Sequence, residues 1–259
     1  MRLISTVCRL QSQGDLKVAE ISAPDVVPGS VVVAVVRGGI CGSDLHYYQN
    51  GGIGSIRVQE PIILGHEISG TIKKLGDRTS DLKVGDKVAV NPSQPCLDCH
   101  HCKRSEHQHC LNMRFLGSAR TMPHVQGGFQ SNLLVPATQC VKVRRETSLA
   151  SAACAEPLAV CLHAAVQAGD LDGKRVLITG AGPIGALCAA VSKLQGAATV
   201  VVTDLTDFTL EVAQQMGASE CINVSKTAAA MEKFKKAPDQ FDVVFECSAA
   251  DTAIHIARD

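Results

Sequence analysis

Residues 174–185 read Lys174-Arg175-Val176-Leu177-Ile178-Thr179-Gly180-Ala181-Gly182-Pro183-Ile184-Gly185, an apolar run that passes directly into three closely spaced glycines. A segment rich in Ala and Leu follows, so the pattern predicts a strand, a tight turn and a helix. In such a turn the first glycine permits the bend, the second lets the backbone approach a pyrophosphate, and the third lets helix and strand pack closely. The sequence therefore predicts a dinucleotide site, made by Gly180, Gly182, Pro183, Ile184 and Gly185.

Strands and helices alternate after this turn. The apolar run 199–203 ends in Asp204, about twenty residues beyond the glycines, where a carboxylate accepts the hydroxyls of an adenosine ribose and repels a 2′-phosphate. Asp204 therefore favours NAD over NADP. The alternation continues with helices expected at 209–216 and 227–236 and strands at 221–223 and 241–247. Residues 151–259 thus predict a doubly wound parallel sheet with four of the six strands that such a domain has.

The first 150 residues follow a different pattern, of short β-branched or alternating segments separated by Gly, Pro and Asp. Such segments are typical of strands. The expected strands cover 16–21, 30–36, 67–75, 83–90, 129–135 and 140–143. A helical segment begins near Ser148 and carries Glu156. The predicted fold class is therefore α/β with a strand-rich part, in which residues 1–150 form a first domain and residues 151–259 the doubly wound one.

Two segments of the first domain bring together groups that bind metals. The first reads Gly39-Ile40-Cys41-Gly42-Ser43-Asp44-Leu45-His46-Tyr47-Tyr48, and the second is Gly65-His66-Glu67. A short loop and the head of a strand would carry a thiolate, an imidazole and two carboxylates to one zinc ion. A Cys, a His and a third ligand around an open position are typical of catalytic zinc, which acts as a Lewis acid. One Cys and one His alone would equally describe a buried thiol and a core histidine.

A cysteine-rich lobe follows, which spans residues 96–110 and has the spacing Cys-x2-Cys-x2-Cys-x7-Cys. Four thiolates within one lobe are the closed tetrahedral set of a structural zinc, with no position left for a substrate. An iron–sulfur cluster is the rival interpretation, but the segment lacks the flanking pattern of ferredoxins. The predicted ligands are Cys96, Cys99, Cys102 and Cys110.

The chain has 12 cysteines and no apolar leader at its start, which indicates thiols and metal ligands rather than disulfides. Five of them have the metal roles above. The others are expected to be small buried hydrophobes, namely Cys8, Cys140, Cys154, Cys161, Cys188, Cys221 and Cys247.

Composition excludes several classes of function. Of the 259 residues, 46% are hydrophobic, which is enough for a sizeable core. Lys and Arg total 25, as do Asp and Glu, so no basic field is available to hold nucleic acid or an anionic membrane. No stretch approaches the roughly 18 apolar residues of a membrane span. We expect a cytoplasmic globular protein with neither nucleic-acid nor membrane partners.

The segments Cys41-Gly42-Ser43-Asp44-Leu45-His46 and Gly65-His66-Glu67-Ile68-Ser69-Gly70 resemble the signatures of the zinc-dependent medium-chain alcohol and polyol dehydrogenases, which also carry the cysteine-rich lobe. The resemblance implies a GroES-like catalytic domain at 1–150, an NAD-binding Rossmann domain at 151–259, and two zinc ions per chain. Members of this family run on by roughly another quarter of their length and supply the remaining strands. The chain is therefore expected to be a C-terminally truncated member, with the full-length protein a homo-oligomer.

The resemblance also implies roles for individual residues at the catalytic zinc. Cys41 and His66 are expected to be ligands. Classical alcohol dehydrogenases use a second cysteine as the third ligand, whereas this chain has Glu156 at the corresponding place, as the polyol dehydrogenases do. We expect Glu156 to be the third ligand, directly or through a water. Glu67 is the competing carboxylate, which could bind the zinc directly, exchange with a water on the ion, or contact the ligands without binding the ion.

Further residues are expected to handle the proton and the substrate. The resemblance implies that Ser43 accepts the hydrogen bond of the substrate hydroxyl and that His46 relays the proton to the surface through the cofactor ribose. Asp44 is expected to orient His66. Tyr47 or Tyr48 could offer a hydroxyl to a polar substrate.

Residues 113–119 and 123–129 resemble the branch of the family that oxidises L-idonate, a sugar acid, to 5-ketogluconate. Arg114 or Arg120 could then pair with the substrate carboxylate, although both could equally be solvated surface residues. Three alternatives remain open: a sorbitol or xylitol dehydrogenase, a non-catalytic zinc- and nucleotide-binding fragment, and a docking module built on the cysteine-rich lobe.

Overall fold

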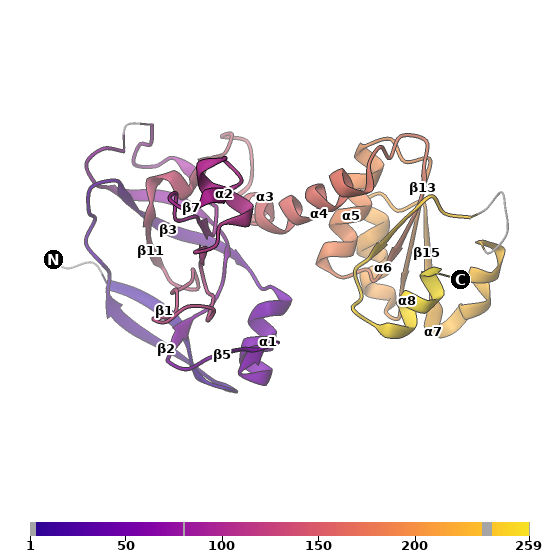
Figure 1. Ribbon diagram of the computed structural model, residues 1–259, viewed down its shortest axis with the longest axis horizontal. Coiled ribbons are helices and arrows are strands. Elements are labelled where there is room, and N and C mark those ends of the chain that lie inside the picture. Colours follow the sequence, from indigo (N-terminus) through magenta and orange to yellow (C-terminus); the bar gives the residue numbers. More distant parts are fainter. Residues whose placement is uncertain (1–3, 80, 235–239, 259) are drawn as a thin grey trace. The chain divides into compact units, whose positions relative to one another are not determined.

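A computed structural model describes residues 4–79, 81–234 and 240–258. The chain divides into two compact units, Met1–Glu156 and Pro157–Asp259 (Figure 1). The strands of the first unit are β1 Ile4–Ser12, β2 Asp15–Ser22, β3 Ser30–Gly39, β4 Gly52–Ile53, β5 Ile56–Arg57, β6 Ile62–Ile63, β7 Glu67–Leu75, β8 Lys87–Val90, β9 Ser93–Gln94, β10 Arg114–Phe115, β11 Asn132–Pro136 and β12 Cys140–Lys142. Its helices are α1 Gly42–Asn50, α2 His100–Lys103, α3 Leu149–Ala153 and the 3-10 turns η1 His107–His109 and η2 Ala137–Gln139.

The first unit is built on a five-stranded antiparallel sheet with the order β11-β3-β7-β8-β12. The β-branched run in β3 supplies Val31 and Val33, which pack with Ile68 and Ile72 of β7 in the main apolar cluster. The alternation in these strands puts one face into that cluster. The strand-rich first part is therefore confirmed.

The sheet β2-β1-β6 lies against the first through backbone hydrogen bonds. The Cys8 amide donates to the Phe129 carbonyl (2.8 Å), and the Ser131 amide donates to the Thr6 carbonyl (2.8 Å). The strand predicted at 129–135 begins only at Asn132, because the preceding amides, from residue 127 to residue 129, donate instead to carbonyls of residues 63–65.

The second unit is an all-parallel sheet with the order β15-β14-β13-β16. Its strands are β13 Arg175–Thr179, β14 Thr199–Asp204, β15 Glu220–Asn223 and β16 Val243–Glu246. The helical segments are α4 Ala155–Ala168, α5 Pro183–Leu194, α6 Asp207–Gln215, α7 Val224–Thr227, the 3-10 segment η3 Ala228–Phe234 and α8 Asp251–Arg258. The predicted doubly wound half is confirmed, and the helix expected at 227–236 is instead α7 followed by η3, with residues 235–236 outside the described part.

Helices cover both faces of this sheet (Figure 1). Val176 of β13 and Val200 of β14 face α5 and α6 in one apolar cluster. Leu177 and Val201, one residue further along, face Met231 of η3 in another. A parallel sheet buried on both faces reads as continuous apolar runs, which explains the sequence of β13 and β14.

The cysteines expected to be small buried hydrophobes differ in burial, and Cys8, Cys140, Cys221 and Cys247 are only partly buried. Cys161 and Cys188 are buried, as expected of small apolar side chains. Cys154 is exposed, because it caps the carboxyl end of α3 instead of facing a core. In the described part of the chain, no helix is both long enough and apolar enough to cross a membrane.

Candidate metal and nucleotide sites

Cys41 is the N-cap of helix α1, so the loop expected around Ser43 and His46 is in fact a helix. The sequence Cys-x-x-Asp explains the difference, because an acidic residue three positions after the cap closes a capping box. The Cys41 amide donates to Asp44 Oδ2 at 3.0 Å. Ser43 and His46 therefore lie on the first turns of α1, three residues apart and on neighbouring positions of its surface.

Asp44 joins the two metal-binding segments. Its other carboxylate oxygen, Oδ1, accepts a hydrogen bond from the Gly65 amide at 3.0 Å, and the side chain is buried. The same oxygen lies 3.9 Å from His66 Nδ1, which is too long for a hydrogen bond. Asp44 therefore acts on His66 by its charge and by fixing the preceding residue, and this arrangement differs from the direct hydrogen bond that metal-bound histidines commonly have.

The segment before His66 is held from its other side by residues 127–129. The Gly128 amide donates to the Gly65 carbonyl (2.8 Å) and the Phe129 amide to the Leu64 carbonyl (2.9 Å). Gly65 has φ of +91°, and a Cβ there would collide with the Phe129 ring. Only glycine fits both the left-handed backbone and the close ring. His66 is thereby directed inward, with its ring centroid 5.3 Å from that of Phe115.

Ligand atoms of Cys41, His66 and Glu67 lie within 4.8 Å of one another. Glu67 is the first residue of β7, and its carboxylate occupies the space beside Gly39 that any Cβ would fill. Glu156, in the first turn of α4, is not part of this group, although it is near enough for its charge to act on His66. The structure thus brings Cys41, His66 and Glu67 together and leaves Glu156 beside them.

The ionisable groups of this site shift the pKa values of one another. A hydrogen bond with His66 lowers the pKa of Cys41, against burial, and Ser43 adds further hydrogen bonds. Burial raises the pKa values of both Glu67 and Glu156. Burial alone would lower the pKa of His66, but Cys41, Asp44 and Glu156 together raise it. A divalent cation would compensate these acidic groups, so the donor set fits zinc.

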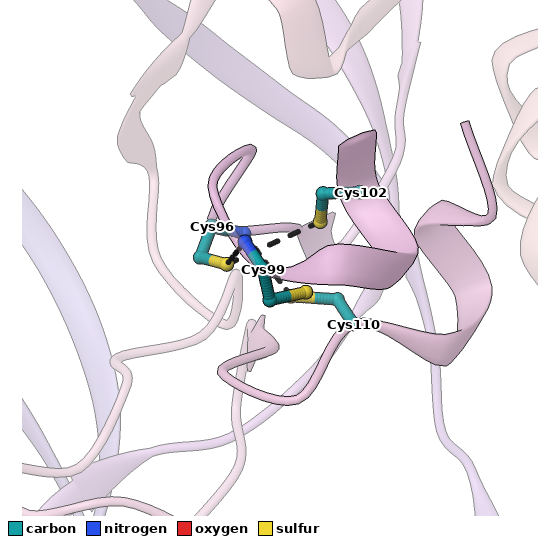
Figure 2. A group of neighbouring side chains, drawn as sticks. All are labelled: Cys96, Cys99, Cys102 and Cys110. Atoms are coloured by element: carbon teal, nitrogen blue, oxygen red, sulfur yellow. Dashed lines mark hydrogen bonds between the residues drawn. The ribbon is translucent and has the colours of Figure 1, made fainter. Parts of the chain in front are cut away.

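The cysteine-rich lobe brings its four sulfurs together, with all ligand atoms within 4.8 Å (Figure 2). Cys99 is the N-cap of α2, and its amide donates to Cys96 Sγ at 3.4 Å. The Cys96 amide donates to Cys110 Sγ at 3.2 Å. Amides directed at sulfur are the environment of thiolates. This group fits a tetrahedral zinc with no open position.

Backbone amides also set the acidity of these thiols. Those of Asp98 and Cys99 lower the pKa of Cys96 to about 6, whereas burial and the other thiols raise that of Cys102 to about 12. Leu97 has φ of +60°, a conformation that costs a non-glycine residue about 1 kcal/mol or more. A lowered pKa at Cys96 and a raised one at Cys102, around a strained turn, fit a segment that metal binding would stabilise.

The residues expected around the substrate are distributed unevenly. The buried Tyr47 hydroxyl accepts a hydrogen bond from the Ala119 amide (3.3 Å), so it supports the fold, while Tyr48 is exposed. A cavity of about 200 Å³ has in its lining Phe115, whose ring neighbours that of His66. Its lining residues are Met113, Phe115, Ser118, Arg120, Thr121 and Val125. Arg114 does not line this cavity, so the two candidate arginines differ.

His46 is exposed on α1, where its Nδ1 lies 3.3 Å from Asn50 Nδ2. It lines a second, open cavity of about 310 Å³ together with Arg57 and the segment 52–54. Ser43 forms hydrogen bonds with Cys41, whereas the His46 side chain faces solvent. Helix α1 therefore carries a hydroxyl at the metal group and an imidazole at the surface.

In the second unit the glycine-rich turn has the geometry that its spacing predicts. Gly180 has φ of +89°, Gly182 is the N-cap of α5, and Pro183 begins that helix. A Cβ on Gly185 would collide with the Gly180 carbonyl. Asp204 at the end of β14 accepts hydrogen bonds from the Ala181 amide (2.7 Å) and the Thr206 amide (2.9 Å). These amides lower its pKa although burial opposes them, so it is a carboxylate beside the turn.

Sequence reasoning missed the supports of the metal group. Gly39 stands in the metal-binding segment itself, but Phe115 and the segment 127–129 carry no metal-binding atom, so no metal motif marks them. Gly127-Gly128 before an aromatic residue was the available signal, because paired glycines mark close backbone approach.

Comparisons with known proteins agree with this architecture. Residues 27–145 match the family described as Alcohol dehydrogenase GroES-like domain, and residues 183–257 match that described as Zinc-binding dehydrogenase. The chain therefore belongs to the zinc-dependent medium-chain dehydrogenases.

Two curated relatives align with most of this chain. L-idonate 5-dehydrogenase (NAD(P)(+)) of Escherichia coli (strain K12) is 43% identical over 224 residues, which cover 86% of this chain and 64% of that protein. Sorbitol dehydrogenase of Bacillus subtilis (strain 168) is 36% identical over 94% of this chain and 68% of its own length. The crystal structure of the E. coli L-idonate 5-dehydrogenase superposes with a TM-score of 0.91 at 39% identity, covering 99% of this chain and 73% of that one. The chain thus spans about two thirds of the length of these curated relatives.

Proposed function

We propose that the protein oxidises a secondary hydroxyl of a sugar acid to a carbonyl and passes the hydride to NAD, with L-idonate as substrate and 5-ketogluconate as product. The observation that carries the proposal is the group Cys41, His66 and Glu67 beside a hydroxyl-bearing helix, in a chain that also has the dinucleotide turn. The similarity to L-idonate 5-dehydrogenase supports the choice of substrate.

Two zinc ions per chain are part of the proposal. Cys41, His66 and Glu67 would hold the first, because their ligand atoms are already grouped. Glu156, which the sequence favoured as third ligand, would reach it through a water or exchange with Glu67. The four cysteines of the lobe would hold the second. When bound at the first site, zinc supplies Lewis-acid polarisation of a substrate oxygen.

Residues of α1 would manage the proton. The Ser43 hydroxyl lies at the metal group and would accept the hydrogen bond of the substrate hydroxyl. His46 is exposed on the next turn and would take the proton to solvent at an imidazole nitrogen.

NAD would bind at the glycine-rich turn of the second unit. The α5 N-terminus offers amides to the pyrophosphate, and the absence of side chains at Gly180, Gly182 and Gly185 lets the backbone approach it. Asp204 would accept the ribose hydroxyls. Its interaction with the Ala181 amide ties the ribose-binding group to the phosphate-binding turn.

Arg120 is the residue we assign to the substrate carboxylate. It lines the cavity that shares Phe115 with His66, and within the described residues no carboxylate pairs with its guanidinium. An unpaired guanidinium in a partly enclosed cavity is well suited to bidentate binding of a carboxylate. Both arginines are exposed, but Arg114, on β10, lines no part of that cavity.

The test is the initial rate of NAD reduction with L-idonate, sorbitol and xylitol. We expect kcat/KM for L-idonate to exceed that for either polyol by about tenfold or more, because the polyols lack the charged group. Cys41→Ser should abolish turnover with all three. A higher kcat/KM for sorbitol would favour the alternative that the similarity to B. subtilis sorbitol dehydrogenase supports, a polyol dehydrogenase. Turnover of none of the three by the wild type would contradict the proposal.

A further inference from the structure

A second acidic residue stands in the turn that carries the ribose-binding carboxylate. Asp207 begins α6, three residues after Asp204, and the two are joined by a turn in which the Thr206 amide donates to Asp204. Asn223, at the end of β15, is the register partner of Asp204 in the sheet. The carboxyl ends of β14 and β15 therefore present one small polar surface beside the glycine-rich turn.

Both oxygens of Asp207 are occupied on this surface. Oδ2 pairs with Lys226 Nζ at 2.5 Å, and Oδ1 accepts a hydrogen bond from Asn223 Nδ2 at 2.5 Å. Ser225, which lies between Asn223 and Lys226 in the chain, holds this segment in place. Its hydroxyl donates to the Leu205 carbonyl (3.3 Å), and its amide donates to Asn223 Oδ1 (3.1 Å). Lys226 is thus a cation next to the ribose site whose charge is already matched.

We propose that Asp207 enforces the choice of NAD over NADP by keeping Lys226 neutralised. The inference rests on the proposed nucleotide site at Asp204. A 2′-phosphate bound there would meet the Asp204 carboxylate, and Lys226, the neighbouring cation, would already be paired with Asp207. Selection against the 2′-phosphate then has two parts. Asp204 repels the phosphate directly, and Asp207 keeps the Lys226 ammonium group from pairing with it.

The arrangement suggests why one carboxylate alone need not be decisive. The E. coli relative carries NAD(P)(+) in its name, so a member of this family can accept either cofactor. Charge pairs this exposed are individually weak, and the Lys226 and Asp207 side chains are 63% and 56% exposed. The preference for NAD over NADP would therefore change if Lys226 were paired with the 2′-phosphate instead of with Asp207.

The test measures binding of two nucleotide probes by isothermal titration calorimetry. Adenosine 5′-monophosphate lacks the 2′-phosphate, and adenosine 2′,5′-bisphosphate carries it. We expect Asp207→Asn to raise the affinity for the bisphosphate by about threefold or more and to leave that for the monophosphate within about twofold. Adding Lys226→Met to Asp207→Asn should remove the gain, and Lys226→Met alone should change neither affinity by more than about twofold.

A matched control comes from the same unit. Glu220 pairs with Lys233 at 2.7 Å in an ion pair of similar exposure on the same sheet, away from the Asp204 turn. Glu220→Gln changes the net charge by the same amount and should leave both affinities unchanged. An equal gain in Glu220→Gln, or a gain that persists without Lys226, would overturn the proposal. No change in Asp207→Asn while the monophosphate still binds would also overturn it, whereas a wild type that binds neither probe would remove the nucleotide site itself.

Discussion

Gly39 shows how a residue with no side chain shapes the metal group. The Glu67 carboxylate lies where a Cβ on Gly39 would be, so the two residues share one space across the β3–β7 pair. Gly39 and Glu67 are register partners at the ends of these strands. The absence of a methyl group at this point is what lets a carboxylate turn toward Cys41 and His66.

Gly39→Ala should therefore displace the Glu67 carboxylate and weaken zinc binding at that site by about tenfold or more. Zinc affinity is measured by competition with a chromophoric chelator. Gly42→Ala is the matched control, because a Cβ there meets nothing within 4 Å. Equal zinc affinity in Gly39→Ala and the wild type would show that Glu67 is not a ligand.

Arg120 and Arg114 make a second pair of matched residues, since only Arg120 lines the cavity beside Phe115. Arg120→Ala should raise KM for L-idonate about tenfold or more, because a carboxylate would lose its charged partner, and should change KM for sorbitol by less than about twofold. Arg114→Ala should alter neither. Equal effects of Arg120→Ala on both substrates would contradict the carboxylate assignment.

Among the elements, helix α1 depends on one capping residue. Asp44 accepts hydrogen bonds from the Cys41 amide, at the start of the helix, and from the Gly65 amide, in the facing segment. Its loss would leave two donors in a buried place without their acceptor.

Asp44→Ala should lower the free energy of unfolding by about 2 kcal/mol and loosen zinc at the first site, while the cysteine-rich lobe keeps its own ion. Chemical denaturation and zinc content measure the two effects. Asp98→Ala is the control, since Asp98 makes an exposed ion pair with Lys103 in the lobe. If Asp44→Ala were as stable as Asp98→Ala and bound zinc as tightly as the wild type, Asp44 would not be the link between the segments.

The elements also show how far local pattern predicts structure. Apolar runs located β3, β7, β13 and β14 well, because their side chains pack as the period implies. Residues 129–131 were predicted to belong to a strand, but the Phe129 and Ser131 amides donate to the carbonyls of Leu64 and Thr6. Such contacts between distant segments cannot be predicted from local pattern. Helix α1 was missed because an apolar period is weak over nine residues with few buried positions. Its capping box has Cys41 and Asp44 where Ser or Thr and Glu or Gln are usual, so the usual sequence signature did not mark it.

At the scale of the whole molecule, motif spacing predicted which side chains lie together better than it predicted the detailed geometry around them. The four lobe cysteines and the pair Cys41 and His66 follow from local motifs and are grouped as expected. The competition between Glu67 and Glu156 could not be resolved from sequence, because the two lie 89 positions apart and depend on the space beside Gly39.

The acidic groups around His66 predict how the metal-free protein responds to pH. Burial raises the pKa values of Glu67 and Glu156, so the folded state holds protons there that the unfolded chain has released. Their contribution to stability is complete below the ordinary carboxyl pKa and is lost as pH rises through the raised values. His66, whose pKa is also raised, adds a loss of the same sign at higher pH.

With zinc removed by chelation, Glu67→Gln should show a smaller decline in melting temperature than the wild type as pH rises from about 4.5 to about 6. Glu20→Gln, at an exposed position of β2, is the control and should follow the wild type. Melting is followed by circular dichroism at each pH. A decline in Glu67→Gln as steep as in the wild type would mean that Glu67 does not carry the burial penalty.

The proposed chemistry requires two separate zinc sites in one chain. The decisive measurement is zinc content per chain by mass spectrometry of the metal, for the wild type, Cys41→Ser and Cys99→Ser. We predict two ions in the wild type and one in each variant, with NAD-dependent turnover absent from Cys41→Ser. Two ions retained in Cys41→Ser, or a single ion in the wild type, would contradict the assignment of Cys41, His66 and Glu67 as a metal site.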